Sequence, residues 1–182
     1  MQQEFETRVL DVDVKQVTAR LRELGAQESP EALQKRWVFD IECLDAQKPG
    51  TGEWVRLRQV NGKSTLTYKN RRGNGISETS EIEVNVADFD KTAEILSRLT
   101  CFTGKYLQEN KRKKFILNNI EFTLDTWPMI PTFLEVEAES KEKVRHGLKL
   151  LGLEGKDSEH IGTIGIYAKY GIDLHSFKEL KF

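Results

Sequence analysis

Apolar and polar residues alternate along many short stretches of the chain, with the period of two that is typical of β-strands with two different faces. The first stretch places Glu4, Glu6 and Arg8 on one face, and Phe5 and Val9 on the other. An edge strand with a solvated charged face would look the same, so one such strand means little. The pattern returns along the chain, however, and predicts about eight strands, at residues 4–8, 35–41, 53–60, 63–70, 77–86, 106–117, 120–126 and 132–139.

Between the strands, apolar residues recur at helical spacing behind residues that favour helix N-termini. These capping residues are Asp13, Asp88 and Ser140. We therefore expect helices from these residues to about 25, 99 and 151, and a further helix beyond about 158. The pair Asn61-Gly62 predicts a tight hairpin turn, and most neighbouring strands are predicted to form antiparallel hairpins. Loops are expected at residues 27–33, 45–52 and 71–75.

The composition is that of a globular protein, and we expect one domain over residues 1–182. Charged residues make up 31% of the chain, hydrophobic residues 38%, and the net charge is −1. A chain this close to neutral has no general field that would recruit nucleic acid, so we expect charge to act locally. No stretch has the length of a membrane span, and no signal sequence is recognised. Cys43 and Cys101 have no metal-like spacing, which favours reduced thiols in a cytoplasmic protein.

The polar faces of the predicted strands carry charges of both signs. For any single strand, exposure to solvent explains such a face well. Three separate Glu-x-Glu pairs are harder to explain this way, because solvated faces are usually loose mixtures of polar residues. The acids on these faces are Glu4, Glu6, Glu81, Glu83, Asp125, Glu135 and Glu137. The bases are Arg8, Arg56, Arg58, Lys69, Arg112 and Lys114.

The alternative is a sheet that curls into a closed barrel with its polar face inside. We therefore predict an α+β fold in which eight antiparallel strands form a barrel, and the helices pack on its apolar outer face. Burying so many charges is costly unless they pair or meet a charged ligand. A polyanion with divalent cations would satisfy both signs, because Arg and Lys bind phosphate oxygens and carboxylates bind Mg²⁺ or Mn²⁺.

In the order and spacing of these motifs, over nearly its whole length, the chain resembles the CYTH family of triphosphate tunnel metalloenzymes. This family includes class IV adenylate cyclases, thiamine triphosphatases and inorganic triphosphatases. The motifs that carry the resemblance are Glu4-x-Glu6-x-Arg8, Arg56-x-Arg58, Thr67-x-Lys69, Glu81-x-Glu83, the basic strand around Arg112, and Glu135-x-Glu137.

The resemblance implies a tunnel in which each of these residues has a role, whereas structural salt bridges are the simpler alternative for each. It implies catalytic roles for Glu4, Glu6 and Arg8. It implies triphosphate binding by Arg56, Arg58, Lys69, Arg112 and Lys114. It implies that Mg²⁺ or Mn²⁺ is bound by Glu4, Glu6, Glu81, Glu83, Asp125, Glu135 and Glu137.

Two positions depart from the family pattern. Arg8 stands where the family has Lys, which keeps the charge but replaces a point donor by a planar fork. Asn110 stands where Lys is expected in the basic strand, and Lys111 beside it has the parity of the other face. Either a bulge brings Lys111 inward, or one phosphate contact is lost.

The resemblance favours an enzyme of the class IV adenylate cyclase type, which converts ATP to cyclic AMP and pyrophosphate. A triphosphatase acting on inorganic triphosphate, thiamine triphosphate or a nucleotide is the alternative, and a polyphosphate-binding module without turnover is a third. Trp54 shares a face with Arg56 and Arg58, where it would stack on a base. The apolar tail, residues 166–173, either covers one mouth of the tunnel or joins a homodimer.

Overall fold

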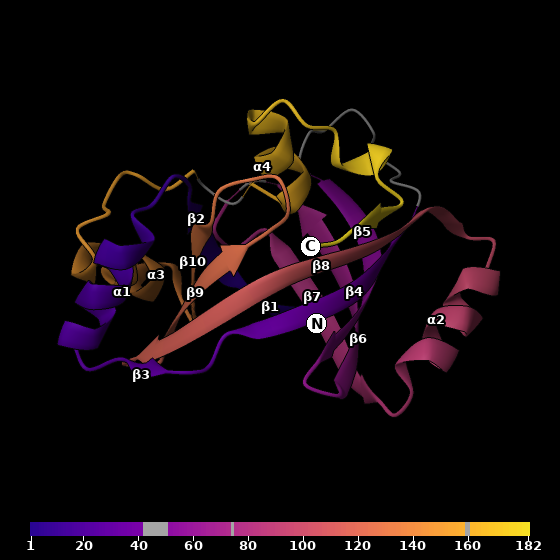
Figure 1. Ribbon diagram of the computed structural model, residues 1–182, viewed down its shortest axis with the longest axis horizontal. Helices are drawn as coiled ribbons and strands as arrows, with labels where there is room; N and C mark the ends of the chain where they lie inside the picture. The colour runs from indigo at the N-terminus through magenta and orange to yellow at the C-terminus, as the bar shows by residue number, and fades with distance from the viewer. Residues whose placement is uncertain (42–50, 74, 159–160) are drawn as a thin grey trace.

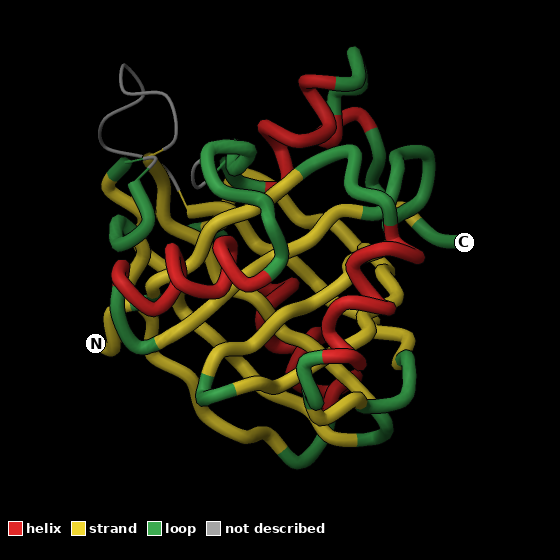
Figure 2. The backbone as a smooth tube through the Cα atoms, turned by 90° about the vertical axis from the view of Figure 1, so that its left-hand side faces the viewer, coloured by secondary structure: helices red, strands yellow, loops and turns green. Residues whose placement is uncertain are grey.

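The computed structural model describes residues 1–41, 51–73, 75–158 and 161–182. Its strands form one curled sheet, and its helices lie around the outside (Figure 1, Figure 2). The strands are β1 (Gln2–Gln3), β2 (Phe5–Val9), β3 (Gln27–Glu28), β4 (Ala32–Ile41), β5 (Thr51–Val60), β6 (Lys63–Arg72), β7 (Thr79–Val86), β8 (Phe102–Leu117), β9 (Ile120–Thr126), β10 (Phe133–Ala138) and β11 (Glu179–Leu180). The helices are α1 (Val14–Glu23), α2 (Phe89–Arg98), α3 (Lys141–Leu150), α4 (Thr163–Lys169) and the 3₁₀ helix η1 (Leu174–Ser176).

The N-terminal segment closes the sheet into a barrel. Its first part, β1, pairs with β7, and its second part, β2, pairs with β10, so both ends of the order β7-β6-β5-β4-β8-β9-β10 meet on one segment. Between them, the Glu4 N–H donates to the Thr79 carbonyl at 3.0 Å. Among the described residues, the strands pair antiparallel except for β8 with β11. The predicted antiparallel barrel is confirmed, and the two-residue strands β1, β3 and β11 add to its eight longer strands.

The local signals for helix starts and for the hairpin are also confirmed. The side chains of Asp13, Asp88 and Ser140 each accept the backbone N–H of the residue three positions on, at 3.0, 2.9 and 3.3 Å. These caps satisfy N–H groups that have no partner within the helix. Asn61 and Gly62 both have positive φ, 49° and 78°, as a tight two-residue turn requires.

The predicted loops differ from the structure in three places. Residues 27–33 include β3, which pairs with the end of β8, and the start of β4. Residues 71 and 72 extend β6, so Arg71 lies in the sheet opposite Gly52 and Thr79. Of the loop predicted at 45–52, residues 51 and 52 belong to β5, while residues 45–50 and Cys43 lie outside the described part of the chain.

The apolar faces of the strands point outward, where the helices cover them. On one side, α1 and α3 pack on β2, β8, β9 and β10 around Phe122 and Val144, which are fully buried. On another, α2 covers β4 and β5 around Leu57 and Phe89. The C-terminal segment forms a third apolar cluster with residues 127–133. Because the apolar surface is buried outside the barrel, the polar faces of the strands are left for its interior.

The C-terminal segment lies across one end of this interior. The Arg8 guanidinium donates to the Ile161 carbonyl at 2.5 Å, and the Tyr167 hydroxyl donates to the Pro128 carbonyl at 2.7 Å. Gly162 packs so closely on the inner-face residue Arg71 that a Cβ there would overlap the guanidinium. The chain just before α4 therefore covers the inward-pointing residues Arg8 and Arg71.

Candidate active site

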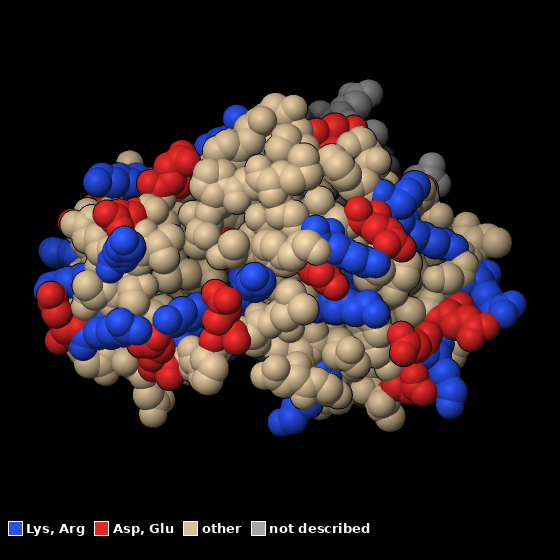
Figure 3. All heavy atoms as spheres, in the orientation of Figure 1, with Lys and Arg blue, Asp and Glu red and all other residues tan. Residues whose placement is uncertain are grey.

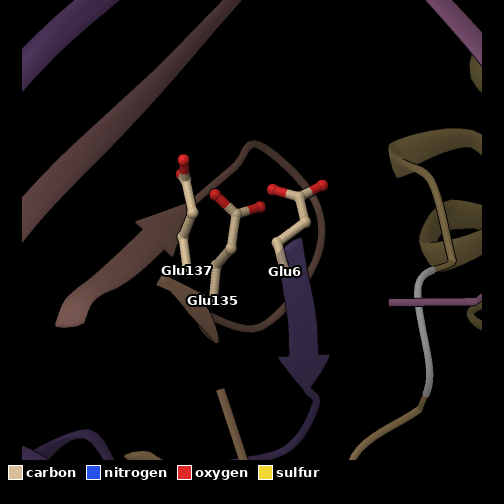
Figure 4. A group of neighbouring side chains, drawn as sticks. All are labelled: Glu6, Glu135 and Glu137. Atoms are coloured by element: carbon tan, nitrogen blue, oxygen red, sulfur yellow. The ribbon is translucent and has the colours of Figure 1, made fainter. Parts of the chain in front are cut away.

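A group of three carboxylates lies on the neighbouring strands β2 and β10. Glu6 is paired in register with Glu137, and Glu135 is two residues along the same strand. Figure 4 shows the three side chains projecting to the same side of the sheet, and one carboxylate oxygen of each lies within 4.8 Å of the others. Glu6 and Glu135 are almost completely buried, at 6% and 4% exposed.

The three carboxylates differ in how their charge is compensated. Burial and the charge of Glu135 raise the pKa of Glu6 to about 7, although Arg8 acts against this. Burial and the charges of Glu135 and Glu6 raise the pKa of Glu137 to about 8. Burial also opposes the charge on Glu135, but Arg112 and Arg8 outweigh it and hold the pKa of Glu135 well below its usual range. The group is therefore short of positive charge around Glu6 and Glu137.

These donors fit a divalent cation. Mg²⁺ and Mn²⁺ prefer oxygen ligands, and carboxylates are the usual ones in proteins. Burial and the charge of the neighbouring carboxylates raise the pKa values of Glu6 and Glu137, and a bound cation would offset both effects. Glu6, Glu135 and Glu137 are the residues that would hold it.

The opposite wall of the barrel is basic. In the closed strand order, β4 and β5 lie half-way round from β2 and β10. Their inward residues include Arg36, Arg56 and Arg58, and Arg36 is paired in register with Arg58. Burial, together with the charges of Arg56 and Arg112, lowers the pKa of Arg58 to about 10. The buried Nε of Arg56 has no hydrogen-bond partner.

Glu83 is the carboxylate closest to this basic wall. It lies 3.7 Å from Arg56 and 3.6 Å from Arg58, and it accepts a hydrogen bond from the Thr67 hydroxyl at 2.6 Å. The two ion-pair distances are long, so the arginines keep donor capacity for another anion.

Lys69 lies on β6, between the basic wall and the acidic wall in the closed strand order. Its ammonium group lies 2.7 Å from Glu4 and 3.2 Å from Glu81. Burial raises the pKa of Glu4, with Lys69 acting against it, whereas Lys69 outweighs burial at Glu81 and lowers the pKa of that group. Trp54 is paired in register with Lys69, so its place on the inner face agrees with its parity.

Arg112 lies on β8, between the two walls on the other side of the barrel. Its guanidinium donates to both oxygens of Asp125, at 2.9 and 2.5 Å, and to Glu135 at 3.0 Å. Asn110 also donates to Asp125, at 2.7 Å, and is completely buried. Asp125 therefore acts in this structure as an acceptor for side chains of β8.

The structure brings most of the predicted site residues together in the barrel. The Arg8 guanidinium donates to Glu135, at 2.7 Å, to Glu6 and to a backbone carbonyl. Lys114 lies at the end of the acidic wall, where it pairs at 2.7 Å with Glu121, the residue opposite Glu137, and its side chain is 40% exposed. The bulge that would bring Lys111 inward does not occur: β4 and β8 stay in register there, and Lys111 lies over the Phe182 ring.

Among the described residues, the sequence analysis did not single out the inner-face residues Gln34, Arg36 and Arg71. All three are buried, at 6%, 7% and 8% exposed. The parity of β4 could have identified Arg36, since its neighbours Trp37 and Phe39 define the outer face. The sequence predicts a loop at residues 71–75, so the alternation of strand residues does not place Arg71 on either face.

Two hollows lie near the barrel. One of about 340 Å³ opens at the β5–β6 hairpin and is lined by the inner-face residues Arg58 and Thr65, so it marks one mouth of the interior. A larger groove of about 540 Å³ lies outside the barrel between α3 and the loop after β6, and no residue of either wall lines it. Of the charged residues on the two walls, Arg58 lines the first hollow.

Comparison with known proteins identifies the family. The model of the CYTH domain matches residues 2–149. The chain belongs to the CYTH family. CYTH proteins generally act on triphosphates and depend on metal ions, which agrees with the paired acidic and basic walls.

The relatives with CYTH folds are distant. A protein of Methanocaldococcus jannaschii described as a candidate adenylate cyclase is 29% identical over 137 residues, which is 74% of this chain and 75% of that protein. A solved structure from Pyrococcus horikoshii has a TM-score of 0.72 at 24% identity and covers 87% of this chain and 96% of its own. A candidate adenylyl cyclase from Hippeastrum, described as having a dominant triphosphatase activity, has a TM-score of 0.55 at 18% identity, with 92% and 96% covered.

On the face of the molecule drawn in Figure 3, charge has no comparable organisation. Lys and Arg are interspersed with Asp and Glu on the face in Figure 3, and its upper part, over α4, is largely uncharged. None of the helices in the described part of the chain has the length and apolar character needed to cross a bilayer. The segregated charge is thus found inside the barrel.

Proposed function

We propose that this CYTH protein is a metal-dependent enzyme that binds a triphosphate inside the barrel. One observation carries the proposal: a wall of arginines on β4 and β5 faces a wall of carboxylates on β2 and β10. Arginine forks suit phosphate oxygens, and clustered carboxylates suit Mg²⁺ or Mn²⁺. A triphosphate between the walls would contact the arginines on one side and metal ions held by the carboxylates on the other.

The charge balance inside the barrel requires the two ligands to bind together. Acidic and basic side chains occur in similar numbers among the described inner-face residues, and most of them are paired. A triphosphate alone would leave the interior strongly negative, and a metal ion alone would leave it positive. Together they leave it close to neutral, which keeps the cost of burial low.

Ligand binding would also redistribute the existing ion pairs. Lys69 and Arg112 are held by Glu4 and by Asp125 with Glu135. If Glu135 held a cation, Arg112 would be able to turn one donor toward phosphate, and Lys69 could do so from Glu4. Arg56 and Arg58 need less rearrangement, because their contacts with Glu83 are long. Arg8 positions Glu6 and Glu135.

For the reaction itself we propose the adenylate cyclase type, which the description of the Methanocaldococcus jannaschii relative supports. The ribose 3′-hydroxyl gives its proton to solvent and its oxygen attacks the α-phosphorus, the bond from that phosphorus to the bridging oxygen breaks, and pyrophosphate leaves with the electron pair. Arg56 and Arg58 stabilise the charge that develops on the leaving pyrophosphate. A bound metal ion supplies charge neutralisation and lowers the pKa of the attacking hydroxyl. Trp54 is our candidate for contact with the base.

Triphosphate hydrolysis is the second candidate, favoured by the activity described for the Hippeastrum neighbour. Water would replace the ribose hydroxyl as the nucleophile, and the same walls would bind the phosphates.

The two reactions give different products. Purified protein is incubated with Mn²⁺ and either ATP or inorganic triphosphate, with Glu4→Gln as the inactive variant and Glu94→Gln on the surface of α2 as its control. We expect cyclic AMP and pyrophosphate from ATP. Orthophosphate without cyclic nucleotide would replace the cyclase by a triphosphatase. Ligand-induced stabilisation without any product would favour the binding module.

A further inference from the structure

Arg36 is a buried cation on β4 that forms no ion pair with any acidic residue in the described part of the chain. It is 7% exposed, and its Nη2 donates to the side-chain oxygens of Gln34, at 3.1 Å, and Asn110. Among the described residues, no carboxylate lies within ion-pair distance of it. Its Nε is buried and has no hydrogen-bond partner. Within the described residues, the acceptors of the Arg36 guanidinium are thus neutral amides.

The surroundings of Arg36 make this arrangement costly. Arg58 on β5 is paired in register with Arg36. Burial, together with the charges of Arg56 and Arg112, lowers the pKa of Arg36. A buried cation next to other cations is unfavourable unless an anion approaches it. Among the described buried basic residues, Arg8, Arg112 and Lys69 have carboxylates within 3.0 Å. The unmet demand for negative charge therefore lies at Arg71, near the C-terminal segment, and at Arg36 with its neighbours on β5.

The side chain is nevertheless held in a fixed position. Its guanidinium carbon lies 4.7 Å from the centre of the Trp127 ring, which is itself 4% exposed and packed edge-on against Tyr167. Stacking on an aromatic face and two amide acceptors orient the planar fork. A cation that is preorganised but uncompensated is the arrangement expected at an anion-binding position.

Asn110 explains why a cation is needed from β4. Asn110 occupies the position in β8 where the CYTH pattern has Lys, and the side chain of Arg36 donates directly to its oxygen. The two residues come from neighbouring strands, with Gln34 paired opposite Asn110 and Arg36 two residues further along. The positive charge missing from β8 is thus present next to it, on a different strand.

We propose that Arg36 binds a phosphate group of the substrate and replaces, from β4, the cation that Asn110 does not provide. This inference rests on the proposed triphosphate function. It adds a third phosphate-binding residue to the two already proposed, Arg56 and Arg58. It also implies that the phosphate chain extends along β4 toward the Trp127 end of the barrel.

The direct test is calorimetric titration with a methylene-bridged triphosphate, which cannot be cleaved, in the presence of Mn²⁺. Arg36→Gln should weaken binding by roughly tenfold to a hundredfold, as expected for a charged hydrogen bond. Arg36→Lys should lose less than Arg36→Gln. Arg98→Gln, at an exposed position on α2, is the control and should bind like the wild type.

Two further measurements separate ligand binding from a structural role. Without ligand, Arg36→Gln should melt at the same temperature as the wild type or higher, because an uncompensated buried cation has been removed. The double variant Arg36→Gln/Asn110→Lys should recover most of the lost affinity, because it returns the cation to β8.

The inference is overturned if Arg36→Gln binds the analogue as tightly as the wild type. It is also overturned if this variant melts lower and the added Lys at position 110 restores nothing, which would make Arg36 a packing residue. Failure of the wild type itself to bind the analogue with Mn²⁺ would instead contradict the proposed function.

Discussion

At the scale of single residues, the barrel interior combines compensated and uncompensated charges. Arg112 and Asp125 satisfy each other through two hydrogen bonds, and Lys69 is shared by Glu4 and Glu81. Such pairs are stable without a ligand. Around Glu137 the acids outnumber their partners, and around Arg36 the bases do, so these two places are where ligands of opposite charge should bind.

The first prediction concerns pH and metal affinity. The pKa values of Glu6 and Glu137 are raised to about 7 and about 8, so both carboxylates bind protons that a metal ion must displace. Affinity for Mn²⁺, measured by calorimetry, should therefore rise steadily from pH 6 to about 8.5 and should be accompanied by proton release. Glu137→Gln should remove the upper part of this rise. A constant affinity over this range would contradict the assignment of these groups.

The same raised pKa values affect stability without metal. A carboxylate with a raised pKa is destabilising when it is charged, so the metal-free protein should lose stability as the pH rises from about 5 to 8. Glu135 has a lowered pKa and contributes in the opposite direction, with stability that is lost only in stronger acid. Added Mn²⁺ should abolish the loss between pH 5 and 8.

At the scale of elements, the helices are fitted closely to the outer face of the barrel. Gly147 of α3 lies against β9 and β10, and a Cβ at this position would come within 2.8 Å of Val136 and 3.1 Å of Ile120. Glycine is unfavourable inside a helix, so close packing is the reason for it here. The position of α3 fixes the outer side of the strand that carries Glu135 and Glu137.

The prediction for this element is that Gly147→Leu destabilises the protein by about 1–3 kcal/mol, since added volume in a packed interface forces side chains and helix apart. Chemical denaturation monitored by circular dichroism measures the change. His146→Leu, at the adjacent exposed position of the same helix, is the control and should have little effect. Equal stability of the two variants would show that α3 does not pack as described.

Alternation and capping signals in the sequence were sufficient to predict the long strands and the starts of three helices. Both depend on neighbours in the chain, such as Asp88 and the N–H of Lys91. The short strands β3 and β11 could not be predicted, because their pairing with β8 depends on tertiary contacts. The inward position of Arg36 was available from parity, whereas its contact with Asn110 follows only from the register of β4 and β8.

At the scale of the whole molecule, barrel closure determines what the side chains can do together. The sequence places acids and bases on alternate positions of many strands, but it does not say which strands face each other. The observed order places β4 and β5 opposite β2 and β10, and so separates a wall rich in arginine from a wall rich in carboxylates. A different strand order with the same motifs would have mixed them.

This separation predicts cooperative binding. Metal and triphosphate should each stabilise the protein more in the presence of the other, because together they keep the interior close to neutral. Thermal unfolding with Mn²⁺, with the methylene-bridged triphosphate, and with both should show a combined shift that exceeds the sum of the separate shifts. Strictly additive shifts would indicate independent sites on the molecule.

The central claim is that metal and phosphate bind on opposite walls of one interior. A crystal structure with Mn²⁺ and a methylene-bridged triphosphate, with the metal located by its anomalous scattering, tests it most directly. We predict manganese coordinated by Glu6, Glu135 and Glu137, and phosphate groups in contact with Arg56, Arg58 and Arg36. Manganese away from these carboxylates, or phosphate on the outer surface of the barrel, would contradict the account.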